Sequence, residues 1–489
     1  MSDRPPPNIV LVMTDQHRAG LTAGEGFGLD TMPFLDALAA DGMRLRRAYT
    51  TAPACVPART SLLTGRWPSA HRVRQNSTPK AAVRGDDLLD VLGAAGYQTF
   101  FAGKPHMYRG TADFDAFAGP YGHESGPDGT AEERAFSEWL KSIDHGPTDE
   151  ATPFPAELQF AHRIVSDAIG QIDARDTAKP FFSWVSMPEP HNPYQAPEPY
   201  FSLFGEDEVP ERACGPEAAE AKGGAYKWLR DLVEEKRPGY DEGWRHYRAT
   251  YCGMLRLIDD QLRRLVEHLK EQDLWQNTVL VFLADHGDYV GDYGLQRKGA
   301  GMPEALARIP MVVTGPGIPA RDNTRDFVSI ADLLPTVCEA VGRSIPLGVQ
   351  GRSLWPMLTG RDYPAAEFAD VVAERGYGGL PYPEDARPEL HFPYEGTTYD
   401  ALNTVTQSGS SRMLRHDRYK LYSHVDGTGE LYDLDADPME LDNRWDDPSL
   451  RPIRSELMER WQRWSLRLTD DLPQGNYHPN LPRHNWHRT

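Results

Sequence analysis

Five short segments of the chain are almost continuously apolar. They are Asn8–Thr14, Tyr97–Ala102, Phe181–Met187, Thr278–Ala284 and Met311–Thr314. A strand with one face in water alternates between apolar and polar positions, whereas a strand covered on both faces is apolar throughout. The pattern therefore predicts five buried parallel strands in a sheet that is covered on both sides.

Amphipathic segments lie between these apolar runs. Thr31–Ala40 begins with a residue that can cap a helix and ends near Gly42, and Asp86–Ala95 ends at Gly96. In Glu242–Gln272, one helical face is formed by Tyr247, Tyr251, Met254, Leu255, Ile258, Leu262, Leu265 and Leu269. Strands that alternate with helices predict an α/β fold, with a central, mostly parallel sheet and helices on both faces.

The pattern changes near residue 366. Short apolar segments separated by turn residues predict a small antiparallel sheet, followed by a helix over Pro452–Leu468. The strands of this sheet are Val371–Arg375, Met413–Leu414, Tyr419–Ser423 and Glu430–Asp433. We therefore expect an N-terminal α/β domain, residues 1–365, and a C-terminal subdomain, residues 366–489. Residues 473–489 lack a helical period and form either a disordered tail or an arm on a neighbouring subunit.

The segment from Glu189 to Trp244 is long and aromatic. Its aromatic residues include Tyr194, Tyr200, Phe201, Phe204, Tyr226, Trp228 and Tyr240. Long loops in compact domains tend to be functional. Two interpretations remain open. The segment forms a wall of the binding pocket, where aromatic faces suit sugar rings, aryl groups or quaternary ammonium, or it packs between the subunits of a homo-oligomer.

The charge balance argues against some classes of partner. Of the 489 residues, 52 are basic and 72 are acidic, and a net charge of −20 repels nucleic acid and anionic lipid. No apolar run approaches the ~18 residues of a membrane helix. Residues 1–7 contain no apolar signal-peptide core, and four scattered cysteines are too few for a disulfide framework. We expect a cytoplasmic protein that binds neither nucleic acid nor membranes.

Polar residues that can carry chemistry follow four of the predicted strands. In chain order these are Asp15, Gln16, Lys104, His106, His191, Asp285 and His286. Ligands of open α/β sheets bind beyond the carboxyl ends of the strands, and those ends meet at one edge of a parallel sheet. The residues are therefore expected to form one site.

Asp15, Gln16, Asp285 and His286 together offer two carboxylates, an amide oxygen and an imidazole. This set suits one divalent cation. The oxygen ligands favour Ca²⁺ or Mg²⁺, and the imidazole also admits Mn²⁺. Alternatively, an Asp at the end of a strand caps a turn or the next helix. For either Asp alone, capping is as good an interpretation as metal binding. For both together, metal binding is the better interpretation.

Cys55 lies where a helix is expected to begin, with Pro57 in its first turn. The amides and the positive dipole end of such a helix favour an anion beside Cys55. Arg59, one turn further, could hold the group at Cys55 or neutralise a bound oxyanion. A buried, inert cysteine is an equally good interpretation of this spacing alone.

The whole segment Cys55–Arg66, CVPARTSLLTGR, resembles the signature of the type I sulfatases in the alkaline phosphatase superfamily. Further stretches that resemble this family are Asn8–Gln16, Gly103–His106, His191–Tyr194, Leu283–Asp288, Gly294–Lys298, Tyr419–Leu421 and Glu430–Leu434. The chemical motifs occur in the family's order. The resemblance implies an alkaline-phosphatase-like fold and hydrolysis of a sulfate ester.

In that family the motif cysteine is oxidised after translation to Cα-formylglycine, whose hydrate is the nucleophile. The resemblance gives this role to Cys55, with a formylglycine-generating enzyme as its maturation partner. It assigns one divalent cation, best matched by Ca²⁺, to Asp15, Gln16, Asp285, His286 and the modified Cys55. Such a cation lowers the pKa of the attacking hydroxyl and holds a substrate oxygen.

The resemblance also implies roles for four basic residues. Lys104 and His106 match the pair that flanks the formylglycine, with His106 as the base. His191 and Lys298 match the pair that grips the sulfate, with His191 as the acid that protonates the leaving alcohol. Together with Cys55 and Arg59, these are the expected catalytic residues.

Two residues depart from the commonest sulfatase pattern. Gln16 and His286 stand where many sulfatases carry Asp and Asn, and this combination also occurs in relatives that hydrolyse phosphonate monoesters and phosphodiesters. A phosphonate or diester hydrolase with the same nucleophile is therefore an alternative. A catalytically silent binding protein is a third, less favoured one, because every expected catalytic position holds a competent residue. The net charge favours a small-molecule or saccharide ester over a heavily sulfated polymer.

Overall fold

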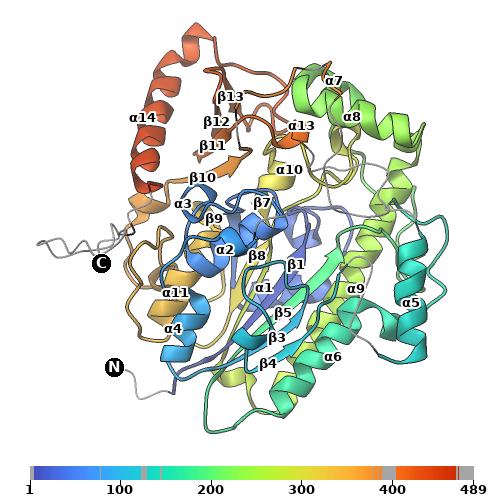
Figure 1. Ribbon diagram of the computed structural model, residues 1–489, viewed down its shortest axis with the longest axis vertical. Coiled ribbons are helices and arrows are strands. Elements are labelled where there is room, and N and C mark those ends of the chain that lie inside the picture. The colour runs from blue at the N-terminus through green and yellow to red at the C-terminus, as the bar shows by residue number, and fades with distance from the viewer. Residues whose placement is uncertain are drawn as a thin grey trace, which may run out of the picture.

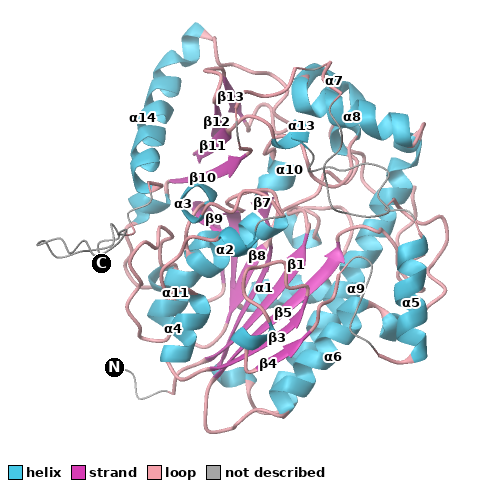
Figure 2. Ribbon diagram, viewed as in Figure 1, coloured by secondary structure: helices cyan, strands magenta, loops and turns pink. Residues whose placement is uncertain are grey.

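The computed structural model describes residues 5–76, 79–122, 129–143, 146–377, 379–383, 385–387, 404–469 and 472. A mixed sheet forms its centre, with the strand order β4-β3-β5-β1-β6-β8-β2-β7 and with β9 paired to β2 (Figure 2). The parallel part consists of β4 (Ala116–Ala118), β3 (Gln98–Gly103), β5 (Phe181–Pro190), β1 (Asn8–Asp15) and β6 (Thr278–Ala284). This part confirms four of the five predicted strands. The predicted tail over 473–489 lies outside the described residues.

The fifth predicted strand exists, but its predicted direction is wrong. β8 (Met311–Thr314) runs antiparallel to β6 on one side and to β2 (Met43–Tyr49) on the other. An apolar run reports burial on both faces and says nothing about direction. Between β6 and β8 the described helices are a 3₁₀ turn (Asp292–Gly294) and the short α10 (Glu304–Ala307), so the chain returns along the sheet without a long crossover helix.

Helices cover both faces of the sheet, as the pattern predicts (Figure 1). Along β1, Leu11 and Met13 contribute to one apolar cluster, and Val10 and Val12 to the other. The helices that contribute to the first cluster are α2 (Cys55–Thr64), α4 (Leu88–Ala94), α11 (Leu333–Ala340) and α12 (Trp355–Leu358). Those of the second are α1 (Pro33–Asp41), α5 (Ala131–Ser142), α6 (Phe160–Asp173) and α9 (Trp244–Glu271). The described helices include none that is both long and apolar enough to cross a bilayer.

Several elements are missing from the sequence-based picture. β2, β7 (Arg308–Ile309) and β9 (Arg321–Ser329) extend the sheet beyond β8, and the charged residues in them hide an apolar pattern. The long aromatic segment is not wholly a loop, because it contains α7 (Pro216–Lys222) and α8 (Gly224–Lys236). In α8, Trp228 is buried in a cluster with Tyr289.

A second, antiparallel sheet follows, as predicted, in the order β10-β11-β12-β13 (Figure 1). Its strands are β10 (Asp370–Arg375), β11 (Ser411–His416), β12 (Tyr419–His424) and β13 (Gly429–Asp433), and the short α13 (Thr404–Gln407) precedes β11. The final helix α14 (Arg451–Arg467) packs Trp464 on Trp67, with ring centroids 5.5 Å apart.

β10 is hydrogen-bonded to the segment before α2 and to the segment between α2 and the short α3 (Pro68–His71). The backbone N–H of Glu374 donates to the carbonyl of Thr51, and the indole N–H of Trp67 donates to the carbonyl of Val372. The small sheet therefore lies against the segment that leads into α2.

Candidate active site

Two parallel strands bring the central carboxylates together. β1 and β6 are adjacent and in register, with Thr14 opposite Ala284, so Asp15 and Asp285 leave the sheet side by side. α2 begins at Cys55, as predicted, and presents its sulfur to them. One potential ligand atom from each of Asp15, Cys55, Asp285 and His286 can be chosen so that all lie within 4.8 Å of one another.

Arg59 and Lys104 hold these carboxylates in place. The Arg59 guanidinium donates to Asp285 Oδ2 at 2.9 Å, to Asp15 Oδ2 at 3.2 Å and to Ser186 Oγ at 2.7 Å. Lys104 Nζ lies 2.7 Å from Asp15 Oδ2, and all these charged side chains are fully buried. Burial alone would raise the pKa of Asp15, but Lys104 and other neighbouring basic groups hold it well below its usual range.

His286 presents its unprotonated nitrogen to the cluster. Its Nδ1 donates to the carbonyl of Gly287 at 2.9 Å, and its Nε2 lies 3.3 Å from Cys55 Sγ. Burial lowers the pKa of His286 to about 4, so the imidazole is neutral at physiological pH. A neutral imidazole and two carboxylates that converge in a buried space are donors that fit a divalent cation.

Gln16 is held from both its backbone and its side chain. Its backbone is left-handed, with φ of 62°, and its carbonyl accepts from Tyr251 Oη at 2.6 Å. The side-chain Nε2 donates to Asp288 Oδ2 at 2.7 Å, which leaves Oε1 to accept from Lys298 Nζ at 2.7 Å. Lys298 Nζ also lies 3.1 Å from His191 Nε2, so Gln16, Lys298 and His191 form one connected row.

Sequence reasoning missed Asp288. This buried carboxylate accepts hydrogen bonds from Gln16, from Tyr194 Oη at 2.7 Å and from Tyr247 Oη at 2.6 Å. Burial raises its pKa. Tyr194 belongs to the aromatic segment, but it is fully buried, and its hydroxyl contacts Gln16 and Asp288. Two signals were present in the sequence: Asp288 lies three residues after Asp285, and it ends the family-like stretch Leu283–Asp288.

Cys55 and His106 complete the expected set. Cys55 is only 1% exposed, and burial together with Asp15 raises the pKa of its thiol to about 11, so the unmodified thiol is protonated at neutral pH. His106 follows β3 within electrostatic range of Lys104 and Asp15. Burial and the charge of Lys104 hold the pKa of His106 well below its usual range, so this imidazole is neutral.

Comparison with known proteins shows the family of the chain, because the sulfatase family model matches residues 7–343. The chain belongs to the sulfatase family. It is 30% identical to the multifunctional alkaline phosphatase superfamily protein PehA of Trinickia caryophylli, over 95% of this chain and 96% of that protein. It is 25% identical to an arylsulfatase of Clostridium perfringens, over 89% and 90% of the two chains. The crystal structure of the phosphonate monoester hydrolase of Agrobacterium radiobacter is similar to this sulfatase fold with a TM-score of 0.75 and 25% identity, over 95% and 96% of the two chains.

Membership of the sulfatase family makes this chain a hydrolase, and sulfatases generally use a metal ion and a formylglycine. The residues that resemble the family's motifs are brought together here. Asp15, Cys55, Asp285 and His286 form the central cluster, Arg59 and Lys104 contact its carboxylates, and Lys298 joins Gln16 to His191.

The position of Asp288 leads to a first prediction for this sulfatase. Asp288→Asn would place an amide among three side-chain and two backbone donors and free the Gln16 amide to rotate, so that its N–H₂ could replace Oε1 beside the cluster. We expect the affinity for a divalent cation to fall about 10–100-fold, measured by calorimetry on the purified protein.

A matched control is Asp259→Asn. Asp259 is another buried carboxylate, but it accepts from the backbone N–H groups of Phe34 and Leu35 at the start of α1. This variant should lose thermal stability and keep the cation affinity of the wild type. An unchanged affinity in Asp288→Asn would remove the proposed link between Asp288 and Gln16.

Proposed function

We propose that this protein hydrolyses sulfuric esters, releasing sulfate and an alcohol, with a nucleophile derived from Cys55. The observation that carries the proposal is the cluster at the start of α2. There the Cys55 sulfur lies with carboxylate and imidazole atoms of Asp15, Asp285 and His286 within 4.8 Å of one another. Family membership supplies the reaction class, and this geometry supports the role of Cys55.

Asp15, Gln16, Asp285 and His286 would hold one divalent cation, for which we propose Ca²⁺ ahead of Mg²⁺ or Mn²⁺. When bound, the cation supplies positive charge that lowers the pKa of a hydroxyl and holds a substrate oxygen. We also propose that a formylglycine-generating enzyme converts Cys55. A formylglycine supplies a hydrated aldehyde as nucleophile, with a second hydroxyl that lets sulfate leave without attack by water.

The remaining residues orient groups and move protons. Lys104 and Arg59 keep the Asp15 carboxylate ionised and fixed. His106, neutral in its buried position, accepts a proton at the nucleophile. Lys298 binds a sulfate oxygen, and its contact with His191 Nε2 orients the imidazole that gives a proton to the leaving alcohol.

A phosphonate monoester hydrolase is the second candidate. Gln16 and His286 favour it, and so does the overall similarity to a phosphonate monoester hydrolase structure. Both reactions would use the same nucleophile, and they differ in the group transferred. For the first candidate, the hydrolysis of sulfuric esters, the alcohol part of the natural substrate is a small molecule or a saccharide.

The experiment that separates these candidates compares two matched esters. Protein would be co-expressed with a formylglycine-generating enzyme, and the conversion of Cys55 would be checked by peptide mass. We expect kcat/KM for an aryl sulfate to exceed that for the matching aryl phosphonate monoester at least tenfold. A preference for the phosphonate would replace the proposed function by the second candidate.

A further inference from the structure

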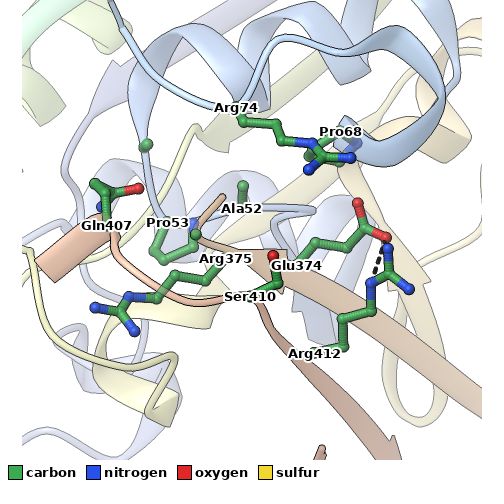
Figure 3. A pocket seen from close by; sticks show the side chains of 11 residues that line it. Ala52, Pro53, Pro68, Arg74, Glu374, Arg375, Gln407, Ser410 and Arg412 are labelled. Atoms are coloured by element: carbon green, nitrogen blue, oxygen red, sulfur yellow. Dashed lines mark ion pairs between the residues drawn. The ribbon is translucent and has the colours of Figure 1, made fainter. Parts of the chain in front are cut away.

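A small cavity of about 20 Å³, which opens to solvent, lies between the chain that leads into α2 and the small antiparallel sheet (Figure 3). Ala52, Pro53 and Ala54 line one side of it, and Arg375 of β10 and Arg412 of β11 line another. Because Cys55 directly follows Ala54, this side of the cavity lies within at most about 11 Å of backbone from the candidate nucleophile. A substrate with a single ring could span that length.

Three guanidinium groups and one carboxylate surround the cavity. Glu374 Oε1 forms an ion pair with Arg412 Nε at 3.1 Å, drawn as the dashed line in Figure 3, and Glu374 Oε2 accepts from the backbone N–H of Ser69 at 2.7 Å. Arg412 is therefore neutralised. Arg74 and Arg375 have no carboxylate partner among the described residues, and the cavity carries an excess of positive charge.

Arg375 is the unusual group. Its Nη2 donates to the carbonyls of Gly299 and Thr406, and its buried Nε has no acceptor among the described residues. Burial lowers the pKa of this guanidinium, and the negative charge of Glu430 offsets that effect only in part. An uncompensated buried charge is costly. An anion bound in the cavity would supply the charge that Glu430 supplies only in part.

We propose that this cavity binds an oxyanion on the alcohol part of the substrate, so that the preferred esters carry a second negative charge. A carboxylate or a second sulfate meets the requirement, since guanidinium groups pair with both through parallel hydrogen bonds. The inference rests on the proposed function, because it places the ester group at Cys55. It adds that Arg74 and Arg375 select the alcohol.

The net charge of −20 limits the ligand to a small one. Beyond this cavity the negatively charged surface repels anions. For a long polyanion, this repulsion along its length would cancel the electrostatic attraction of the two arginines. A small alcohol that carries one further oxyanion places its charge only where the protein compensates it.

The test uses an aryl sulfate with a carboxymethyl substituent, its carboxamide isostere and the corresponding second sulfate ester. We expect the matured wild-type enzyme to prefer the carboxylate or the second sulfate over the carboxamide at least tenfold in kcat/KM, mainly through KM. The better of the two charged esters identifies the oxyanion. Equal kcat/KM for all three would overturn the inference.

Two variants locate the effect. In Arg375→Gln and in Arg74→Gln the preference for the charged ester should fall at least fivefold, and Arg361→Gln is the control. Arg361 is a half-exposed arginine paired with Glu339 outside the cavity. An equal loss on charged and uncharged esters would mean that the arginines only support the fold. Arg74→Gln keeps the test open if Arg375→Gln does not fold.

A binding measurement separates this inference from the proposed function. Calorimetry with the carboxymethyl alcohol and its carboxamide needs no turnover, and the wild type should bind the carboxylate at least tenfold more tightly. Tighter binding without hydrolysis of any sulfate would retain the cavity and reject the proposed function. Equal binding of the two alcohols would reject the cavity, whatever ester is hydrolysed.

Discussion

Replacement of Cys55 by alanine should abolish ester hydrolysis and leave the fold intact. Cys55 is the proposed source of the nucleophile, and removal of a nucleophile costs on the order of 10⁴–10⁶ in kcat. The change removes a single sulfur atom from a buried position, so we expect a stability loss of about 1 kcal/mol. The measurements are kcat/KM on the aryl sulfate and the thermal unfolding midpoint.

The matched control is Cys338→Ala. Cys338 is an equally buried free thiol in α11, within the apolar cluster on the same face of the sheet as α2. It should show the same small loss of stability with full activity. The opposite result, substantial turnover by Cys55→Ala and none by Cys338→Ala, would be incompatible with Cys55 as the source of the nucleophile.

Arg59→Met should destabilise the cation-free protein by about 3–5 kcal/mol. The Arg59 guanidinium is fully buried and contacts both Asp15 and Asp285, so its loss leaves two buried carboxylates with Lys104 as their remaining close cation. The variant should also bind a divalent cation more tightly, because one positive charge no longer repels it. Added Ca²⁺ should therefore raise the unfolding midpoint further than in the wild type.

Arg352→Met separates this effect from the loss of any buried ion pair. Arg352 is buried and lies 2.9 Å from Asp332, outside the central cluster. It should lose a similar free energy of unfolding and keep the response of the wild type to Ca²⁺. If both variants responded to Ca²⁺ alike, Arg59 would have no electrostatic influence on the cation.

The sequence predicted those parts of the molecule that depend on local pattern. Apolar runs located β1, β3, β5 and β6, and the meeting of parallel strand ends brought Asp15 and Asp285 together. The direction of β8 could not be predicted in this way, because burial on both faces is the same for either direction.

The contacts that tune the site were less predictable. Asp288 accepts from Tyr247, 41 positions away, and from Tyr194, 94 positions away. Arg59 and Asp285 are separated by 226 positions. No local period records such pairs, so sequence reasoning could name Arg59 as a functional candidate without showing that it holds two carboxylates. The same holds for Arg375, which the sequence presents only as the last residue of a strand.

The attachment of β10 to the chain before α2 also has an evolutionary consequence. The reacting groups belong to the strand ends and α2 of the large sheet, whereas one wall of the neighbouring cavity is built from β10 and β11. If this cavity selects the alcohol as proposed, substitutions in those two strands would change which alcohol is accepted without altering the reacting groups. The strands that line the cavity are thus separate from the residues that carry the chemistry. Related proteins with this architecture could accept different substrates and keep the same catalytic groups.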